Sequence, residues 1–326
     1  MPIRVATVRA ADVPATQTNF PFYVDLGRVG ATALTLADAQ SSRWYTDTDL
    51  VTQMAREIVS LTEGHGKYAS LTSTSKIAID YDGIRADYAV GDTYGRNAVW
   101  SDYEMVLHLE SGVSDSTGNG HAQTAGSGIT TGVTGKVGKG SQYSGSSSYS
   151  FVNGTFAGGT SDRTLTAWVK SDVTTGNRFA YSYGLDAAQR MMGFTSFNTT
   201  NWYSTVNSGD NDTGVAINTS VYQKLTIQYT GTQVLVHVDG VLEVTRTITI
   251  NTGTGNFTIG NYPGQTGVPL DGIIDELRFR PSETSTNWET TEYNNQNDEA
   301  TFWGTWTTFG GGPAAVNARR LFLMMV

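Results

Sequence analysis

The chain has 326 residues, a length that suits two domains of ordinary size, and its formal net charge is −9. Charged residues make up only 16% of the chain, which argues against a helical bundle or a coiled coil. The chain has no cysteine, which excludes disulfides, thiolate metal sites and cysteine nucleophiles. The acidic balance without a basic stripe argues against a nucleic-acid partner. Aromatic residues reach 11%, which argues against a disordered chain. After these exclusions we expect a folded, all-β protein.

In chain order, the first distinctive segment is 49–61, where Leu50, Met54 and Ile58 have helix-like spacing. We therefore expect a helix there. A polar, turn-rich run at 91–97 then predicts a domain boundary. The expected division is an N-terminal β domain at 1–98, a second domain at 99–298 and a C-terminal tail at 299–326.

Strand patterns dominate the second domain. An apolar run at 105–109 predicts the first strand. Apolar and polar residues then alternate in several short runs separated by turn residues, at 165–169, 225–229, 234–238, 241–250, 257–260 and 273–279. Asp239-Gly240 predicts a tight hairpin turn. The Gly/Ser/Thr-rich stretch 111–150 holds Tyr143 and Tyr149 and is followed by Phe151, so we expect short strands there and not a linker. Residues 288–297, preceded by capping residues, predict a short closing helix.

The C-terminal end is apolar from Leu321 to Val326 but far too short to cross a bilayer. Two interpretations stay open for it: it covers a groove of its own domain, or it is an assembly hook. The first residues show no charged segment followed by an apolar one, so we expect no secretory signal and no membrane insertion.

A series of motifs follows one order along the second domain: Val106–Glu110, Asp115–His121, Gly135–Gly140, Leu165–Lys170, Val236–Gly240 and Leu270–Phe279. In this order they resemble LamG-like jelly-roll domains of the concanavalin A-like lectin/glucanase superfamily. The resemblance implies a jelly-roll β-sandwich over roughly 100–297. The first hundred residues resemble a small β domain that often precedes such domains, so we expect a smaller N-terminal β-sandwich.

The resemblance also implies a structural calcium ion. Its ligands would be Asp115, Asn119, Asp275 and the backbone carbonyl of His121, since oxygen ligands from a tight loop suit Ca²⁺. The alternative is that Asp115 caps its own turn and Asp275 accepts hydrogen bonds from backbone amides. The sequence leaves both open.

Catalysis by a pair of carboxyl groups has little support. A glycosidase needs two such groups on either side of one bond, and the Glu-x-Asp-x-x-Glu spacing of the superfamily's glucanases is absent from this chain. Asp275 and Glu276 are adjacent on a predicted strand, so we expect their side chains on opposite faces of the sheet. The sequence therefore predicts a protein without enzymatic activity.

Sugar binding fits the segment 179–203 and the nearby Asn207 better, because aromatic faces beside amide groups suit sugar rings. Phe179, Tyr181 and Tyr183 alternate as one strand face, and we expect them in the core. Asn201, Trp202 and Tyr203 lie among Asn-rich turns, and we expect them to contact a ligand.

These observations lead to a hypothesis about function. The chain would be a non-enzymatic structural protein of a virus particle, a capsid decoration or tail-associated protein of a phage. Its lectin-like domain would attach to cell-surface glycans, as a homo-oligomer or in many copies among other virion proteins. The alternatives are an extracellular bacterial adhesin or carbohydrate-binding module and, with less support, a glycoside hydrolase.

Overall fold

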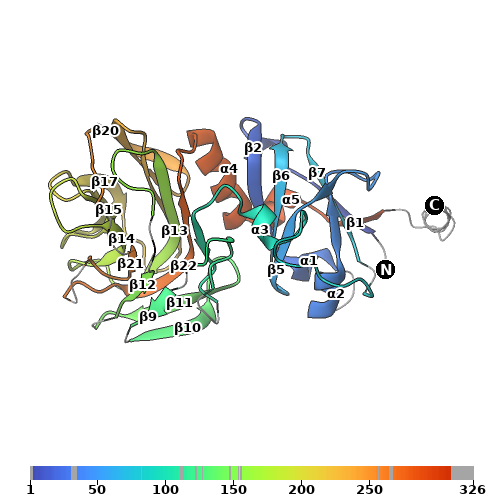
Figure 1. Ribbon diagram of the computed structural model, residues 1–326, viewed down its shortest axis with the longest axis horizontal. Helices are drawn as coiled ribbons and strands as arrows, with labels where there is room; N and C mark the ends of the chain where they lie inside the picture. The colour runs from blue at the N-terminus through green and yellow to red at the C-terminus, as the bar shows by residue number, and fades with distance from the viewer. Residues whose placement is uncertain are drawn as a thin grey trace. The chain divides into compact units, whose positions relative to one another are not determined.

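Figure 1 shows a computed structural model of the chain. The structure describes residues 3–30, 35–81, 83–110, 114–121, 123–126, 128–146, 148–152, 154, 156–253, 255, 257–263 and 267–309. It divides into two compact units, one of residues 1–99 with 294–326 and one of residues 100–293. The apolar end at 321–326, for which two roles were open, lies outside the described residues.

The first unit contains two antiparallel sheets. The larger has the order β23-β1-β7-β3-β4 and the smaller the order β2-β6-β5. The strands are β1 (Ile3–Thr7), β2 (Gln17–Val24), β3 (Arg43–Tyr45), β4 (Gln53–Met54), β5 (Arg56–Ser60), β6 (Glu63–Leu71), β7 (Lys76–Asp80) and β23 (Thr307–Phe309). Five short helical segments accompany them among the described residues, η1 (Ala10–Asp12), α1 (Leu26–Val29), α2 (Leu36–Ser41), α3 (Arg96–Val99) and α5 (Glu299–Trp303).

The segment 49–61 is not helical, so that prediction is wrong. Leu50 has a φ of +56°, which a helix does not tolerate, and the residues after it form β4 and β5. An apolar spacing of four residues also matches one face of a strand, where side chains repeat every two residues. Pairing of β4 with β3 and of β5 with β6 decided between the two structures.

The stretch after residue 298, expected as a separate tail, belongs to the first unit as far as residue 309. Trp303, in α5 (Glu299–Trp303), is fully buried and packs edge-on against Phe22 with ring centroids 5.2 Å apart. β23 then pairs with β1 in antiparallel register. Burial of a large aromatic ring therefore ties this stretch to the N-terminal strands.

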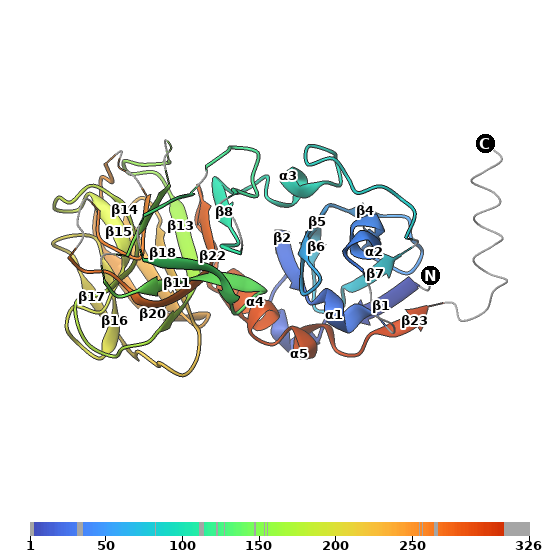
Figure 2. The ribbon, with the colours of Figure 1, turned by 90° about the horizontal axis from the view of Figure 1, so that it is seen from below.

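The second unit is a sandwich of two antiparallel sheets, which appear as two layers in Figures 1 and 2. The first sheet has the order β10-β11-β22-β13-β18-β19-β20, with β8 also paired to β22. Its strands are β8 (Met105–Leu107), β10 (Ile129–Thr134), β11 (Lys139–Ser144), β13 (Arg163–Ser171), β18 (Gln223–Tyr229), β19 (Gln233–Val238), β20 (Val241–Thr247) and β22 (Asp271–Arg280).

The second sheet has the order β17-β16-β15-β14-β21-β12-β9. Its strands are β9 (Gln123–Ala125), β12 (Ser150–Val152), β14 (Phe179–Gly184), β15 (Met191–Thr195), β16 (Asn201–Thr205), β17 (Asn211–Ala216) and β21 (Phe257–Ile259). The all-β jelly-roll sandwich expected from the sequence is confirmed. The hairpin turn at Asp239-Gly240 is also confirmed, since both residues have positive φ, as a type I′ turn requires.

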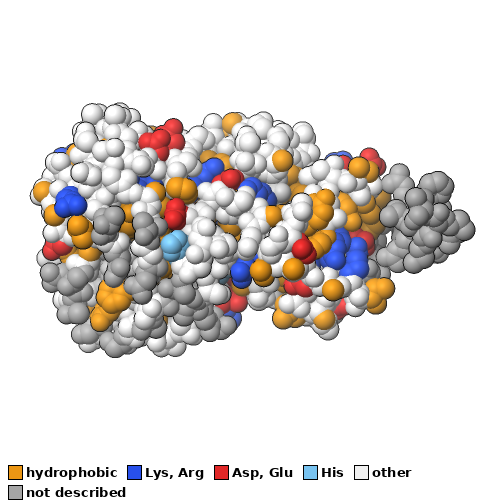
Figure 3. Space-filling view, viewed as in Figure 1, with side chains coloured by type: hydrophobic (Ala, Val, Ile, Leu, Met, Phe, Trp, Pro, Cys, Tyr) orange, Lys and Arg blue, Asp and Glu red, His pale blue; other side chains and the backbone are white. Residues whose placement is uncertain are grey.

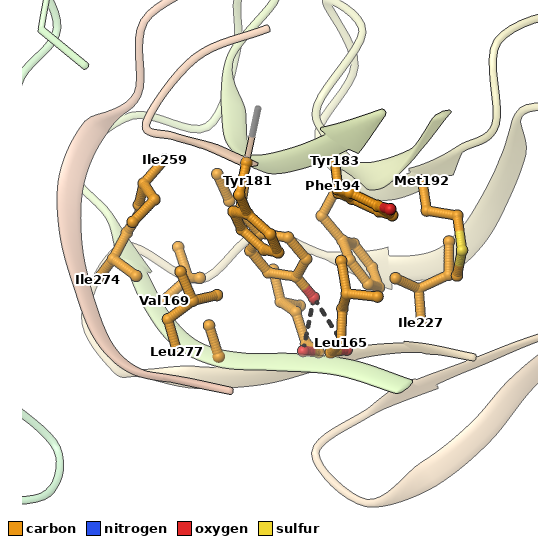
Figure 4. Packing of buried hydrophobic residues seen from close by; sticks show 14 of the residues in the cluster. Leu165, Val169, Tyr181, Tyr183, Met192, Phe194, Ile227, Ile259, Ile274 and Leu277 are labelled. Atoms are coloured by element: carbon orange, nitrogen blue, oxygen red, sulfur yellow. Dashed lines mark hydrogen bonds between the residues drawn. The ribbon is translucent and has the colours of Figure 1, made fainter. Parts of the chain in front are cut away.

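The core of the second unit lies between these two sheets (Figure 4). Leu165 and Val169 from β13 meet Tyr181 and Phe194 from the opposite sheet, and all four are fully buried. The hydroxyl of Tyr181 donates a hydrogen bond to the carbonyl of Leu225 at 2.9 Å, so its buried polar group is satisfied.

Helix α4 (Thr286–Asn297) agrees with the predicted closing helix. The hydroxyl of Ser285 accepts a hydrogen bond from the amide of Trp288 at 3.1 Å and so caps the helix start. Glu289 of α4 contacts Lys224 and Thr226 of β18, whose side chains leave the core face of the first sheet.

In Figure 3 most of the coloured and white surface is white, the colour of the backbone and of side chains that are neither hydrophobic nor charged, in keeping with the low content of charged residues. Within the described chain, the structure contains no helix of the length and apolarity needed to cross a membrane.

Candidate functional site

A pocket of about 370 Å³ lies on the outward face of the seven-stranded sheet. On β16, Trp202 points into the core, so the alternation of side chains directs Thr205 to the outward face, where it lines the pocket. The other described lining residues are Asn177, Phe179, Phe197, Asn207, Asp210, Tyr262, Gly267 and Val268.

Three aromatic rings form the apolar wall of this pocket. Phe179 meets Tyr262 edge-on with ring centroids 4.7 Å apart, and it meets Phe197 edge-on at 6.0 Å. Phe197 and Tyr262 are partly exposed. The wall therefore presents aromatic surface to a ligand.

Phe179 is 2% exposed and so buried as expected, but it lies outside the hydrophobic cluster that contains Tyr181 and Tyr183. The pairing of β14 with β15 shifts register between Phe179 and Tyr181. Ala180 and Tyr181 both belong to the core, so the irregularity leaves Phe179 on the pocket side. Tyr181 and Tyr183 occupy the core as predicted.

Two polar side chains of the pocket keep hydrogen-bonding capacity. One oxygen of Asp210 accepts from the hydroxyl of Thr205 at 2.6 Å and from the amide of Val206 at 3.1 Å. Its second oxygen has no partner among the described residues. The Asn177 carbonyl accepts from Thr195 at 3.2 Å, while its NH₂ group is likewise unpaired within the described chain. The pocket thus offers a free acceptor and a free donor.

A hydrogen-bonded group outside the wall fixes the Tyr262 ring. The Tyr262 hydroxyl donates to Asp186, and the Asn207 NH₂ donates to both at 3.0 Å. The pKa of Tyr262 is raised, first by burial, then by its hydrogen bond to Asp186 and by the charges of Asp186 and Asp210. The phenol therefore stays neutral and acts as a donor.

The backbone around the pocket is strained. Ten non-glycine residues in the described chain have positive φ, and five of them flank this site: Gln189, Phe197, Asn198, Asn207 and Ser208. Phe197 has a φ of +40°, which is uncommon for an aromatic residue. Such conformations persist where surrounding structure holds them, and they cluster at ligand sites.

The structure separates the three residues expected to bind a ligand. Trp202 is 1% exposed, and its indole donates to Gln223 at 2.9 Å within the core, which leaves no ring face for a sugar. Asn201 and Tyr203 lie on the outward face, where both donate to Asp212 at 3.1 Å. The Tyr203 ring lies 5.7 Å from Phe197, so this pair borders the pocket wall.

The expected calcium ligands form two separate hydrogen-bonded groups. Asp115 accepts four bonds, from Val106 N, from Thr117 N and Oγ1, and from His121 N, at 2.6 to 3.0 Å. These fill its acceptor sites. The Asn119 NH₂ donates to the Glu104 carbonyl at 2.9 Å. The expected calcium ligands therefore do not fit the ion as they are arranged. The arrangement matches the alternative in which Asp115 caps its own turn.

Asp275 accepts a hydrogen bond from a different loop. One of its oxygens accepts from the amide of Val137 at 2.8 Å, and the other is buried without a hydrogen-bond partner among the described residues. Burial, then the neighbouring Glu276 charge, raises the pKa of Asp275. Asp275 therefore acts as an acceptor for backbone amides at 136–137, and the structure links it to none of the other three expected ligands.

The expectation that Asp275 and Glu276 face opposite sides of the sheet is wrong. Ile274 and Leu277 both point into the core although they are three residues apart. One extra residue forms a bulge on β22 where it pairs with β13, and Glu276 has a φ of +52°. Both acids leave the core face, but Glu276 pairs with Arg278 and His108 while Asp275 holds the loop.

Part of the second unit matches a known protein family. Residues 143–288 match the family model of the concanavalin A-like lectin/glucanases superfamily. This region is a domain of that superfamily. No curated protein matches the sequence.

Several solved structures are similar to the chain. The binding domain of Paraclostridial mosquitocidal protein 1 is 13% identical, with a TM-score of 0.50 over 63% of this chain and 55% of that one. Domain 4 of a GH43 extracellular arabinanase from Geobacillus stearothermophilus, in complex with arabinotriose, is 22% identical, with a TM-score of 0.48 over 58% of this chain and 97% of the domain. The ligand-binding domain of botulinum neurotoxin serotype D, in complex with N-acetylneuraminic acid, is 13% identical, with a TM-score of 0.48 over 60% of this chain and 51% of that one.

The match spans about half the length of each toxin structure, and at these identities it concerns the fold alone. Sequence reasoning located the aromatic, Asn-rich segment that supplies Phe179, Phe197 and Asn207. It missed Asp210 and Tyr262, because nothing local distinguishes a tyrosine at 262 that only the sheet order brings beside β14.

Proposed function

We propose that the second unit is a non-enzymatic, lectin-like domain that binds glycans in the pocket of Phe179, Phe197 and Tyr262. The observation that carries the proposal is the combination of aromatic wall and free hydrogen-bonding groups in one pocket of a superfamily domain. Sugar rings have C–H faces that pack on aromatic rings and hydroxyl edges that seek donors and acceptors.

The carboxylates of the site support binding over hydrolysis. Asp186 and Asp210 are both exposed, and each already holds neighbouring side chains in place. A general acid for glycoside cleavage normally sits in a buried, apolar place that keeps its proton. Asp275 and Glu276 are engaged with a loop and with basic side chains.

Binding to a glycan array, followed by NMR titration of the best sugars, tests this function. We expect Kd values near about 1 mM, equivalent to about −4 kcal/mol. Phe197→Ala should weaken binding at least about tenfold through loss of stacking surface. Phe151→Ala is the matched control, since Phe151 packs on Tyr149 and does not line the pocket.

Two outcomes contradict the proposal. If no glycan binds, or if Phe151→Ala weakens binding as much as Phe197→Ala, the pocket is not the site. Release of reducing sugar from a polysaccharide panel, lost in Asp210→Asn, supports the glycoside hydrolase alternative.

We propose further that the chain is a virion structural protein, with the first unit holding the particle and the lectin-like unit displayed in many copies. Weak single contacts suit this setting, because many copies acting together raise the overall strength of attachment without new contacts. Mass spectrometry of purified particles of the source phage tests it. We expect the chain in near-stoichiometric, multicopy amounts. Its absence from particles, with recovery from a secreted fraction, favours an adhesin or a carbohydrate-binding module.

A further inference from the structure

The pocket of Phe179, Phe197 and Tyr262 has an uneven charge distribution. Among its described lining residues there is one ionisable acid, Asp210, and there is no lysine, arginine or histidine. Asp186 adds a second carboxylate through its bond with Tyr262. Burial is the first cause of the raised pKa of the Tyr262 hydroxyl, and the charges of both carboxylates add to it.

Two arginines lie near the pocket, but their guanidinium groups are bonded to groups other than the Asp210 carboxylate. Arg178 follows Asn177, but its guanidinium donates to the carbonyls of Gly145 and Pro269, both at 3.1 Å. Arg246 donates to the Asn211 side chain at 3.1 Å and to the backbone carbonyl of Asp210 at 3.4 Å, but it makes no bond to the Asp210 carboxylate. Neither arginine lines the pocket.

We infer that this pocket selects uncharged sugars and discriminates against sugars that carry a carboxylate or a sulfate. The inference rests on the proposed function and names the ligand class for the same site. A sugar hydroxyl can donate to the free oxygen of Asp210, whereas a sugar carboxylate brings only acceptors and a like charge to that oxygen. Like charges placed side by side are a recognised means of rejecting the wrong partner.

Matched sugar pairs isolate the effect of charge. The probes are the methyl glycosides of glucose and glucuronic acid and of galactose and galacturonic acid, titrated into the full chain and followed by NMR. Within each pair the ring is the same and only the C6 group differs. We expect the neutral member to bind about fivefold or more tightly at low salt.

Salt and substitution identify the source of the discrimination. The neutral-to-acid affinity ratio should fall between about 0.01 M and about 1 M salt, because ions screen exposed charges. Asp210→Asn keeps an oxygen for Thr205 and Val206 and should bring the ratio close to one. Asp162→Asn is the control, since Asp162 is exposed, carries the same charge and does not line the pocket.

The outcomes separate the inference from the proposed function. If the acidic sugars bind as tightly as the neutral ones or more tightly, the inference is wrong while glycan binding stands. If neither salt nor Asp210→Asn changes the neutral-to-acid affinity ratio, the inference is also wrong, because the discrimination would then come from shape. If none of the four sugars and no array glycan binds, the proposed function fails and the inference fails with it.

Discussion

The Nζ of Lys224 lies 2.8 Å from a carboxylate oxygen of Glu289, and both side chains are only 1% exposed. The same ammonium lies 2.7 Å from Glu292, which also binds Arg278 at 2.8 Å. These contacts join α4 to the outer face of the eight-stranded sheet. Because buried charges must be paired, the network makes the position of α4 depend on specific partners.

Lys224→Met should destabilise the second unit by about 3–5 kcal/mol, since it leaves Glu289 and Glu292 buried without their shared cation. The double variant Lys224→Met/Glu289→Gln should be less destabilised than the sum of the two single variants, because it removes both members of one pair. Urea unfolding of the four proteins measures this. A loss below about 1 kcal/mol for Lys224→Met, the range of exposed pairs, would contradict a buried network.

Acid should weaken the same network. Burial alone would raise the pKa of Glu289, but the charges of Lys224 and His237 and the hydrogen bonds from Lys224 and Thr284 outweigh it and lower the pKa from 4.5 to about 2. A depressed folded-state pKa means that the contribution to stability is present above pH 4.5 and is lost as the pH falls toward 2. Thermal unfolding from pH 6 to pH 2 should therefore show a smaller decline in Glu289→Gln than in the wild type. Equal declines in both proteins would contradict this assignment.

Asp275 gives the opposite pH dependence. Its pKa is raised by burial and by Glu276, so its contribution is greatest below its ordinary pKa and diminishes as the pH rises. Asp275→Asn keeps an oxygen for the amide of Val137 and carries no charge, so we expect equal or greater stability at pH 7. Asp275→Ala leaves that amide unpaired and should cost about 1–3 kcal/mol. If Asp275→Asn destabilises the protein as much as Asp275→Ala does, this prediction is wrong and the negative charge of Asp275 itself contributes to stability.

The two tyrosines near the pocket distinguish the site found in the structure from the one expected from the sequence. Tyr262→Phe removes the hydroxyl that binds Asp186 and Asn207, and we expect glycan affinity to fall about fivefold. Tyr203→Phe removes only a bond to Asp212 and should change affinity less than twofold, about 0.4 kcal/mol. NMR titration with the best array sugar measures both. A larger loss of affinity in Tyr203→Phe than in Tyr262→Phe would contradict this prediction and would indicate that the glycan binds at β16.

Calcium should have little effect on the second unit, because protein groups already occupy the acceptor sites of Asp115. A ligand that binds only the folded state raises its unfolding temperature. We expect the unfolding temperatures in excess Ca²⁺ and in EDTA to agree within about 1 °C, as measured by calorimetry. A rise of several degrees, abolished by Asp115→Asn, would show that the loop rearranges to bind the ion.

The alternating patterns of the second unit predicted its strands well. The runs at 165–169, 225–229 and 234–238 all lie within strands of the structure. Each run carries its own signal, because a strand with one buried face must repeat every two residues. The pattern did not reveal where a strand gains a residue, as at Glu276.

The ligand-binding residues were predicted only in part. The segment from Phe179 to Tyr203 proved to border the pocket, but Trp202 belongs to the core. Composition identifies a segment rich in aromatic and amide side chains, and it does not say which face of its strand is covered. A shift of one residue moves every side chain to the other face, so that choice depends on pairing with neighbouring strands.

By itself, the sequence determined the class of the fold, the hairpins and the acidic, cysteine-free composition, because period-two alternation and turn residues act over a few neighbouring positions. Only the tertiary structure decided that Phe179, Phe197 and Tyr262 meet in one pocket and that Trp303 joins the N-terminal strands. These contacts join segments far apart in the chain, and the order of strands in the sheets and the bulges within them set which side chains converge.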